Sequence, residues 1–141
     1  MVWKLLIGGG LMALCVIIHA TGVTIAVRWL RDRVASGPHS WPGIWLVIRL
    51  AGFMVLLHLV EISAWGLVYV WRGAMPDVPS ALYFSGVTYT TTGYGDLVLP
   101  QEWRLVGAIE ALTGILMCGL STGFFFAVLS RMVRDESAPA G

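Results

Sequence analysis

The stretch TTTGYGD, residues 90–96, holds the residue types and spacing that most clearly indicate chemistry in this chain. It combines hydroxyl groups, a carboxylate and two glycines in a sequence that is 57% hydrophobic. Gly93 and Gly95 admit positive φ angles that other residues resist, so the backbone there need not be helical. Non-helical backbone presents carbonyl oxygens, and a file of such oxygens can replace the water shell of a monovalent cation. The stretch therefore indicates cation coordination by the main chain.

Three apolar blocks must position this stretch, and they span Leu5–Val27, Ile44–Trp71 and Leu105–Leu129. Each reaches the roughly 20 residues that a helix needs to cross the hydrocarbon core of a bilayer. Charged residues make up 12% of the chain, against about 25% in soluble domains. The sequence therefore predicts an all-α membrane protein with three transmembrane helices. No small-residue cleavage site closes the first block, so we expect it to be retained rather than removed as a signal peptide.

The segment between the second and third blocks predicts a re-entrant loop. Pro79 suits the first turn of a helix, and Asp77 or Ser80 can satisfy the free N–H groups there. We expect a helix over 80–90, too short to span, followed by extended backbone. Non-helical backbone is tolerated at membrane depth only where it is buried in protein or lines a water-filled cavity. One chain supplies one strand of such a lining, so closing a ring around an ion requires a symmetric oligomer.

At these residues the sequence resembles the potassium-channel family. TTTGYGD is closely similar to the selectivity-filter signature of that family. The resemblance implies that Thr91, Thr92, Gly93, Tyr94 and Gly95 form a selectivity filter, with K⁺ held at the first four. It also implies a homotetramer, because the chain carries one filter. The implied architecture is a re-entrant pore helix and filter loop between an outer and an inner helix.

Further residues take roles from the same resemblance. Asp96 would lie at the outer mouth, and Gly114 would be the hinge of the inner helix. Filter support is implied for a group comprising Tyr83, Phe84, Thr88 and Glu110, and we expect Glu110 to hydrogen-bond the pore helix. Two positions depart from the family pattern: Thr92 stands where valine is usual, and Val87 stands where some relatives carry a glutamate behind the filter. The carboxylate that would hold Asp96 from behind is therefore missing.

The resemblance divides the chain into three parts. Residues 1–42 would form an N-terminal transmembrane helix and a cytoplasmic loop, and 132–141 a short cytoplasmic tail. The pore domain, 43–131, would contain an outer helix at 44–71, a pore helix at 80–90, a filter at 91–95 and an inner helix at 104–131. The first helix carries no arginine at every third position, so no voltage sensor is expected.

Arginines set the expected orientation in the membrane. Arg28, Arg31 and Arg33 cluster in the expected loop after the first helix, while Arg131 and Arg134 follow the third. Cytoplasmic segments are enriched in Lys and Arg. We therefore expect a cytoplasmic C-terminus, with the N-terminus and 72–104 outside. The compact architecture implied by the resemblance suits the inner or plasma membrane of a prokaryote.

Ionisable residues inside the blocks are functional hypotheses in themselves. His58 and Glu61 lie at i, i+3 on one face of the second helix, and His19 lies deep in the first. We interpret His58 and Glu61 in one of two ways. They could form a structural pair in which each satisfies the polar group of the other, or they could sense pH, since histidine changes charge near neutral pH. One histidine and one carboxylate fall short of the three protein ligands typical of zinc sites, so no metal site is expected there.

Two other functions stay open at this point. One is a cation channel that does not separate potassium from sodium. The other is an intramembrane enzyme or transporter subunit that uses His19, His58, Glu61 and Glu110, which would leave Gly93–Gly95 without a role. The channel interpretation expects no enzyme activity, no organic cofactor, no nucleic acid and no small-molecule substrate, only K⁺, the lipid bilayer and further copies of the chain.

Overall fold

The computed structural model describes residues 2–35 and 43–137. Within them every regular element is helical, and no strand is present. The elements are α1 (Val2–Ala35), α2 (Gly43–Trp71), α3 (Val78–Tyr89), a short 3₁₀ turn η1 (Gln101–Trp103) and α4 (Arg104–Ser137). Three stretches are long and apolar enough to cross a membrane: Val2–Asp32, Ile44–Trp71 and Gln101–Met132. The prediction of an all-α membrane protein with three spans is confirmed.

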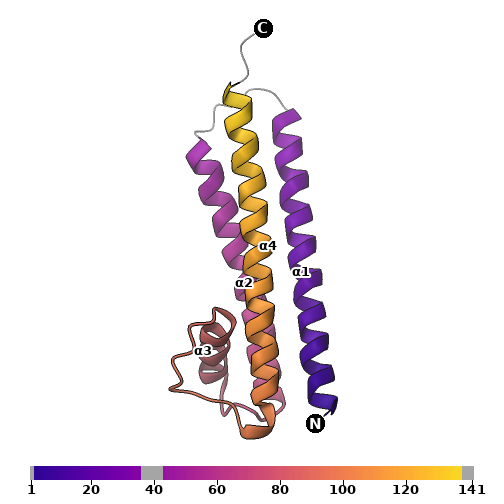
Figure 1. Ribbon diagram of the computed structural model, residues 1–141, viewed down its shortest axis with the longest axis vertical. Coiled ribbons are helices and arrows are strands. Elements are labelled where there is room, and N and C mark those ends of the chain that lie inside the picture. The colour runs from indigo at the N-terminus through magenta and orange to yellow at the C-terminus, as the bar shows by residue number, and fades with distance from the viewer. Residues whose placement is uncertain (1, 36–42, 138–141) are drawn as a thin grey trace.

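The three long helices lie side by side as a bundle, and α3 lies beside one half of it (Figure 1). Helix α1 packs against both α4 and α2, whereas α3 packs against α2 and α4. The start of α1 and the whole α3 region lie at the same end of the bundle (Figure 1). The expected placement of the N-terminus and residues 72–104 on one side of the membrane stays a prediction.

Helix α3 begins at a side-chain cap. The Asp77 carboxylate accepts hydrogen bonds from the Ser80 backbone N–H at 2.8 Å and from the Ser80 hydroxyl at 3.1 Å. Pro79 occupies the first turn, where its missing N–H costs nothing. Because Asp77 is the cap, the helix starts at 78 rather than at the expected 80, and it ends at 89 rather than 90. Its 12 residues span about 18 Å, far less than the hydrocarbon core.

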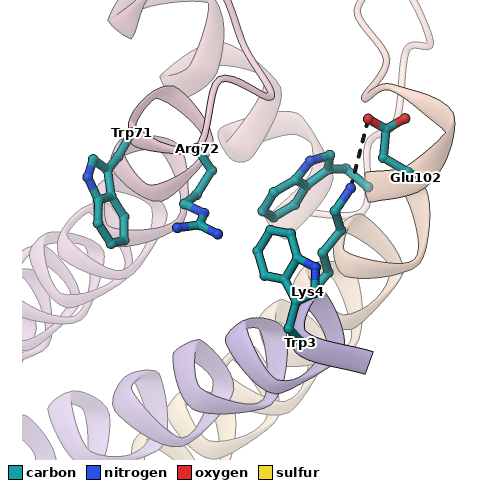
Figure 2. A pocket seen from close by; sticks show the side chains of 6 residues that line it. Trp3, Lys4, Trp71, Arg72 and Glu102 are labelled. Atoms are coloured by element: carbon teal, nitrogen blue, oxygen red, sulfur yellow. Dashed lines mark ion pairs between the residues drawn. The ribbon is translucent and has the colours of Figure 1, made fainter. Parts of the chain in front are cut away.

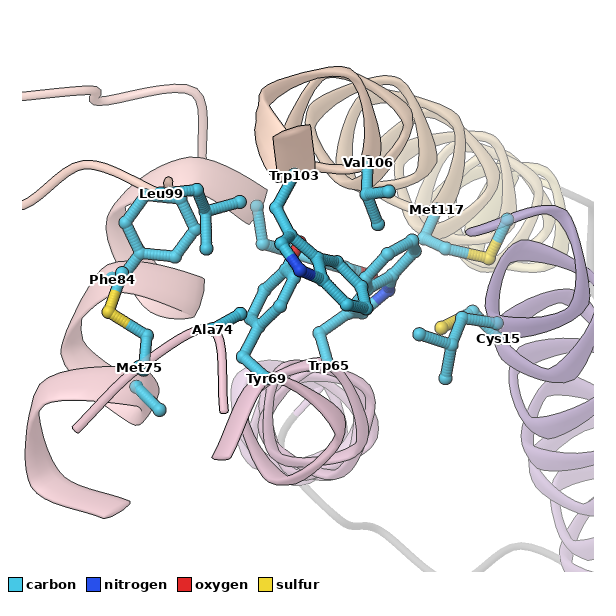
Figure 3. Close-up of a cluster of buried hydrophobic side chains, with 13 residues drawn as sticks. Cys15, Trp65, Tyr69, Ala74, Met75, Phe84, Leu99, Trp103, Val106 and Met117 are labelled. Atoms are coloured by element: carbon cyan, nitrogen blue, oxygen red, sulfur yellow. The ribbon is translucent and has the colours of Figure 1, made fainter. Parts of the chain in front are cut away.

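An aromatic core holds α3 against the bundle (Figure 3). The ring of Tyr69 in α2 contacts Phe84 of α3 and Trp103 edge-on, with centroids 5.6 and 6.3 Å apart. Trp65, one turn away, is fully buried in the same cluster. Edge-to-face aromatic pairs stabilise beyond the area they bury. A second, smaller core lies around Leu50, Met54, Ala26, Phe124 and Val128.

Two predicted boundaries are wrong at the opposite end of the bundle. The inner helix starts at 104 as expected but continues to Ser137, so residues 132–137 of the predicted tail are helical. Helix α1 likewise extends to Ala35, which places Arg28 and Arg31 in its last turns rather than in a loop. Neither extension contains glycine or proline, and arginine is a good helix former. The remainder of the predicted loop and tail, 36–42 and 138–141, lies outside the described residues.

Candidate selectivity filter and its supports

The sign of φ alternates along residues 91–95 of the TTTGYGD stretch. Thr91, Gly93 and Gly95 have φ of 61°, 55° and 78°. The two intervening residues, Thr92 and Tyr94, do not have positive φ. A backbone in which positive and negative φ alternate can turn successive peptide groups toward one side. Thr91 is the one non-glycine residue with positive φ in the described part of the chain. A β-branched residue held there costs about 1–3 kcal/mol, and such strain concentrates at functional sites.

Hydrogen bonds anchor this stretch to the end of α3. The Thr91 N–H donates to the Thr88 carbonyl at 2.9 Å, and the Gly93 N–H donates to the Val87 carbonyl at 3.0 Å. The Thr92 and Thr90 hydroxyls pair at 3.0 Å. Thr88 and Val87 thus contribute main-chain acceptors, and the hydroxyl that Thr92 has where the resemblance expects valine pairs with the Thr90 hydroxyl.

The TTTGYGD stretch, residues 90–96, is called the filter stretch below, and it is exposed on the surface of a single chain. All residues from 90 to 98 are exposed, and the Tyr94 side chain is 71% exposed. Unpaired backbone groups in contact with lipid cost several kcal/mol each. In a membrane the stretch therefore requires either other protein or a water-filled cavity around it.

Asp96, expected at the outer mouth, is held by a side chain of α3. The Tyr83 hydroxyl donates to its carboxylate at 2.7 Å. This hydrogen bond lowers the pKa of Asp96 and raises the pKa of Tyr83. A phenol therefore contacts the carboxylate that was expected to lack a partner. Phe84, expected beside the filter with Tyr83, instead packs into the aromatic core on Tyr69.

We expect Tyr83→Phe to raise the pKa of Asp96 toward the ordinary value of about 3.9 for aspartate. The bond favours the ionised carboxylate, so its stabilising contribution is present at neutral pH and is lost as pH falls through the lowered pKa. In the variant, protonation should occur at higher pH. Carbon-13 NMR of labelled aspartates during an acid titration measures this, with Asp96→Asn identifying the signal. An unchanged midpoint would contradict the bond.

Glu110 of α4 joins three helices at a buried point. Its side chain is 0% exposed and accepts hydrogen bonds from the Ser85 hydroxyl of α3 and from the Tyr69 hydroxyl of α2, the latter at 2.8 Å. The expected contact between Glu110 and the short helix is thus present. The sequence analysis did not identify Ser85 and Tyr69 as partners of Glu110. The signal available in the sequence was a hydroxyl group placed among apolar residues of a helix.

Glu110→Ala should destabilise the protein strongly, because it leaves the Ser85 and Tyr69 hydroxyls buried without an acceptor. Each orphaned group costs about 1–3 kcal/mol. Denaturant unfolding in detergent measures the loss. Glu110→Gln, which keeps an acceptor oxygen, should lose less. Glu102→Ala is the matched control, since the Glu102 side chain is 64% exposed and lies 3.8 Å from Lys4 at the surface. Equal stability of the two alanine variants would contradict this role.

Gly114, predicted as a hinge, lies where α3 ends against α4. A β-carbon on Gly114 would lie 1.8 Å from the Tyr89 carbonyl oxygen. The glycine is therefore required for close packing of the two backbones. Helix α4 continues through it without interruption, and its role as a hinge stays a prediction.

His58 and Glu61 belong to a larger network than the sequence indicated. The His58 Nδ1 lies 3.6 Å from the Glu61 carboxylate, and the same carboxylate accepts hydrogen bonds from the Tyr89 hydroxyl and contacts His19 of α1 at 3.0 Å. The pair thus connects the first helix to the last residue of α3. The sequence analysis named His19 beside this pair, but it missed Tyr89 of α3 and Ser121 of α4, whose hydroxyl lies 3.1 Å from both histidines.

Tryptophans and charges gather at the end of the bundle that carries the filter stretch. A pocket there is lined by six residues: Trp3, Lys4, Trp71, Arg72, Glu102 and Trp103 (Figure 2). The Trp3 and Trp103 rings contact edge-on at 5.6 Å, and the Arg72 guanidinium lies 4.5 Å from the centre of the Trp3 ring. Indoles beside basic groups are typical of the membrane–water interface. This end of the bundle therefore has the composition of an interfacial layer.

Three apolar spans and a short helix that leads into a hydrogen-bonded, non-helical loop define the class of pore-loop membrane proteins. The family model described as "Ion channel" matches residues 55–131, more than half of the chain, and the chain belongs to this family. No curated protein and no solved structure matches it. The protein is therefore an integral membrane protein whose family points to passive ion conduction and away from enzymatic catalysis.

Proposed function

We propose that this protein is a potassium-selective channel, in which four chains surround one pore and K⁺ passes down its electrochemical gradient. The observation that carries the proposal is the alternation of φ along Thr91–Gly95. It allows successive carbonyl groups to face one side, as a file of cation ligands requires. The carbonyls of Thr91, Thr92, Gly93 and Tyr94 would then replace the water around K⁺.

The exposure of residues 90–98 in a single chain supports the tetramer. None of these residues belongs to the aromatic core. Four copies around an axis would place these segments against one another and against a water-filled pore, which removes the cost of exposed backbone in lipid. The apolar residues exposed along α2 and α4 would contact lipid and neighbouring chains.

Electrostatics support a cation as the transported ion. Asp96 is exposed beside Gly95, and the hydrogen bond from Tyr83 keeps its pKa low, so it stays ionised at neutral pH. Four such carboxylates at one mouth would raise the local cation concentration. The C-terminal end of α3, which carries about half a negative charge, leads directly into the filter stretch.

The orientation proposed is a cytoplasmic C-terminus with the filter end outside, in the inner or plasma membrane of a prokaryote. The support for the orientation is that Arg28, Arg31, Arg131 and Arg134 all lie at the end of the bundle opposite α3. Protease accessibility of the C-terminus in intact cells against lysed cells tests it.

The function is tested with the purified full chain in liposomes loaded with potassium. We expect potassium efflux and little sodium flux under matched gradients, with the protein running as a tetramer in native mass spectrometry. Equal potassium and sodium fluxes would replace the proposal by a non-selective cation channel. No flux of either ion in a folded tetramer would refute conduction and return attention to an intramembrane enzyme or transporter subunit.

A further inference from the structure

A cluster of side chains that could bind a metal ion lies between α1 and α2, and it contains none of the residues proposed as the filter. It consists of His19 from α1 together with His58 and Glu61 from α2. His19 and Glu61 are completely buried, and the His58 side chain is 19% exposed. Within α2 alone there are too few ligands for a metal, but α1 supplies the third. Two imidazoles and one carboxylate are the protein ligands of one established kind of zinc site.

The donor atoms already have the spacing that a bound ion requires. Ligand atoms of the three residues lie within 4.8 Å of one another. His19 Nδ1 lies 3.0 Å from Glu61 Oε1, and His58 Nδ1 lies 3.6 Å from Glu61 Oε2. A tetrahedral zinc ion with bonds of about 2.0–2.1 Å holds its ligands about 3.3 Å apart. Small side-chain shifts would therefore suffice to admit the ion.

The groups around the cluster would orient the imidazoles for binding through Nδ1. The Ser121 hydroxyl of α4 lies 3.1 Å from Nε2 of both histidines. With a metal on each Nδ1, both Nε2 atoms carry hydrogen, and the two lone pairs of the Ser121 oxygen can accept both bonds. Hydrogen-bond partners of this kind fix the ring orientation and the tautomer of metal-binding histidines.

A fourth possible ligand, the Tyr89 hydroxyl oxygen, faces the same site. The Tyr89 hydroxyl lies 3.1 Å from His58 Nδ1 and donates to the Glu61 carboxylate. It could complete a tetrahedral set, or it could remain a hydrogen-bond partner of the carboxylate. In either case all four helices contribute to the surroundings of one point: α1 through His19, α2 through His58 and Glu61, α3 through Tyr89 and α4 through Ser121.

We propose that His19, His58 and Glu61 bind one divalent transition-metal ion per chain, with zinc as the ion that fits this donor set best. Imidazole nitrogen suits zinc and its neighbours, whereas Mg²⁺ and Ca²⁺ prefer all-oxygen sites. The ion balances the buried charge of Glu61 and ties α1 to the pore domain. The site does not depend on which ion the pore conducts.

Zinc binding to the full, untagged chain tests the site. The protein is stripped with a chelator in detergent and then titrated with Zn²⁺, and bound metal is measured by elemental mass spectrometry. We expect one zinc per chain and a rise in melting temperature. Co²⁺ in place of zinc should give the intense visible bands of a tetrahedral site. A melting temperature and a metal content unchanged by zinc would overturn the proposal.

Variants locate the binding. His19→Gln should weaken zinc binding about 100-fold or more, because loss of an outer partner alone costs about 10–100-fold. Ser121→Ala, a small change that serves if His19→Gln does not fold, should weaken it about 10–100-fold. Glu102→Gln is the matched control, since Glu102 is a carboxylate with a 64% exposed side chain that does not belong to the cluster. Loss of binding in Glu102→Gln, or equal binding in Ser121→Ala and wild type, would refute the site.

Discussion

Gly93→Ala should abolish potassium flux while leaving the helical bundle folded. Gly93 has φ of 55°, and a β-carbon added there meets nothing within 4 Å in its own chain. The penalty is therefore conformational: a non-glycine residue in the left-handed region costs about 1–2 kcal/mol. Four copies in one ring would cost about 4–8 kcal/mol, which corresponds to about a thousandfold or greater loss of the conducting shape.

Liposome flux, alongside circular dichroism and native mass spectrometry to verify the fold and the tetramer, measures this effect. Gly86→Ala is the matched control. Gly86 lies within α3, and a β-carbon there also meets nothing within 4 Å, so this variant should keep its flux and gain about 0.5–1 kcal/mol of stability. Wild-type flux in Gly93→Ala would mean that this backbone does not line the pore.

Gly114→Ala should prevent normal folding. The added β-carbon would lie 1.8 Å from the Tyr89 oxygen and 2.7 Å from the Tyr89 carbonyl carbon, both of them backbone atoms. No side-chain rotation relieves this overlap, so α3 must move away from α4. Overpacking of a core costs typically 1–3 kcal/mol, and displacement of two backbones should cost about 3 kcal/mol or more.

Thermal unfolding and the yield of tetramer in detergent measure the loss. Gly52→Ala in α2 is the matched control, because a β-carbon on Gly52 meets nothing within 4 Å. The same comparison separates two roles of Gly114. A hinge predicts a stable protein with altered opening, whereas a packing glycine predicts a protein of lowered stability. A stable Gly114→Ala tetramer would therefore contradict the packing role.

Features that depend on local sequence could be predicted. The three spans follow from the length of apolar blocks, and α3 follows from the Asp77 cap with Pro79 in the first turn. The filter stretch stood out because its glycines and hydroxyls interrupt an apolar chain. Its positive φ values fall at both glycines, but the positive φ of Thr91 could not be foreseen, since threonine resists that conformation.

Features that depend on how helices face one another could not be predicted. Hydropathy gives the length of a span but not its rotation about its own axis. His19 and Glu61 are 42 residues apart, and only the packing of α1 on α2 brings them together. Tyr83 and Asp96 meet because the loop turns back along α3. The end of α4 was missed for a different reason, since a charged, polar segment was interpreted as a tail although nothing in residues 132–137 breaks a helix.

Tyr89 has a consequence for how the parts of this protein communicate. Its carbonyl abuts Gly114, its hydroxyl binds Glu61, and the filter stretch begins at the next residue. In the proposed channel, a tilt of α4 or a shift of α1 would therefore reach the filter stretch through this one residue. We expect such a channel to respond to movements of its membrane-spanning helices, with the pore opened or closed at the filter stretch.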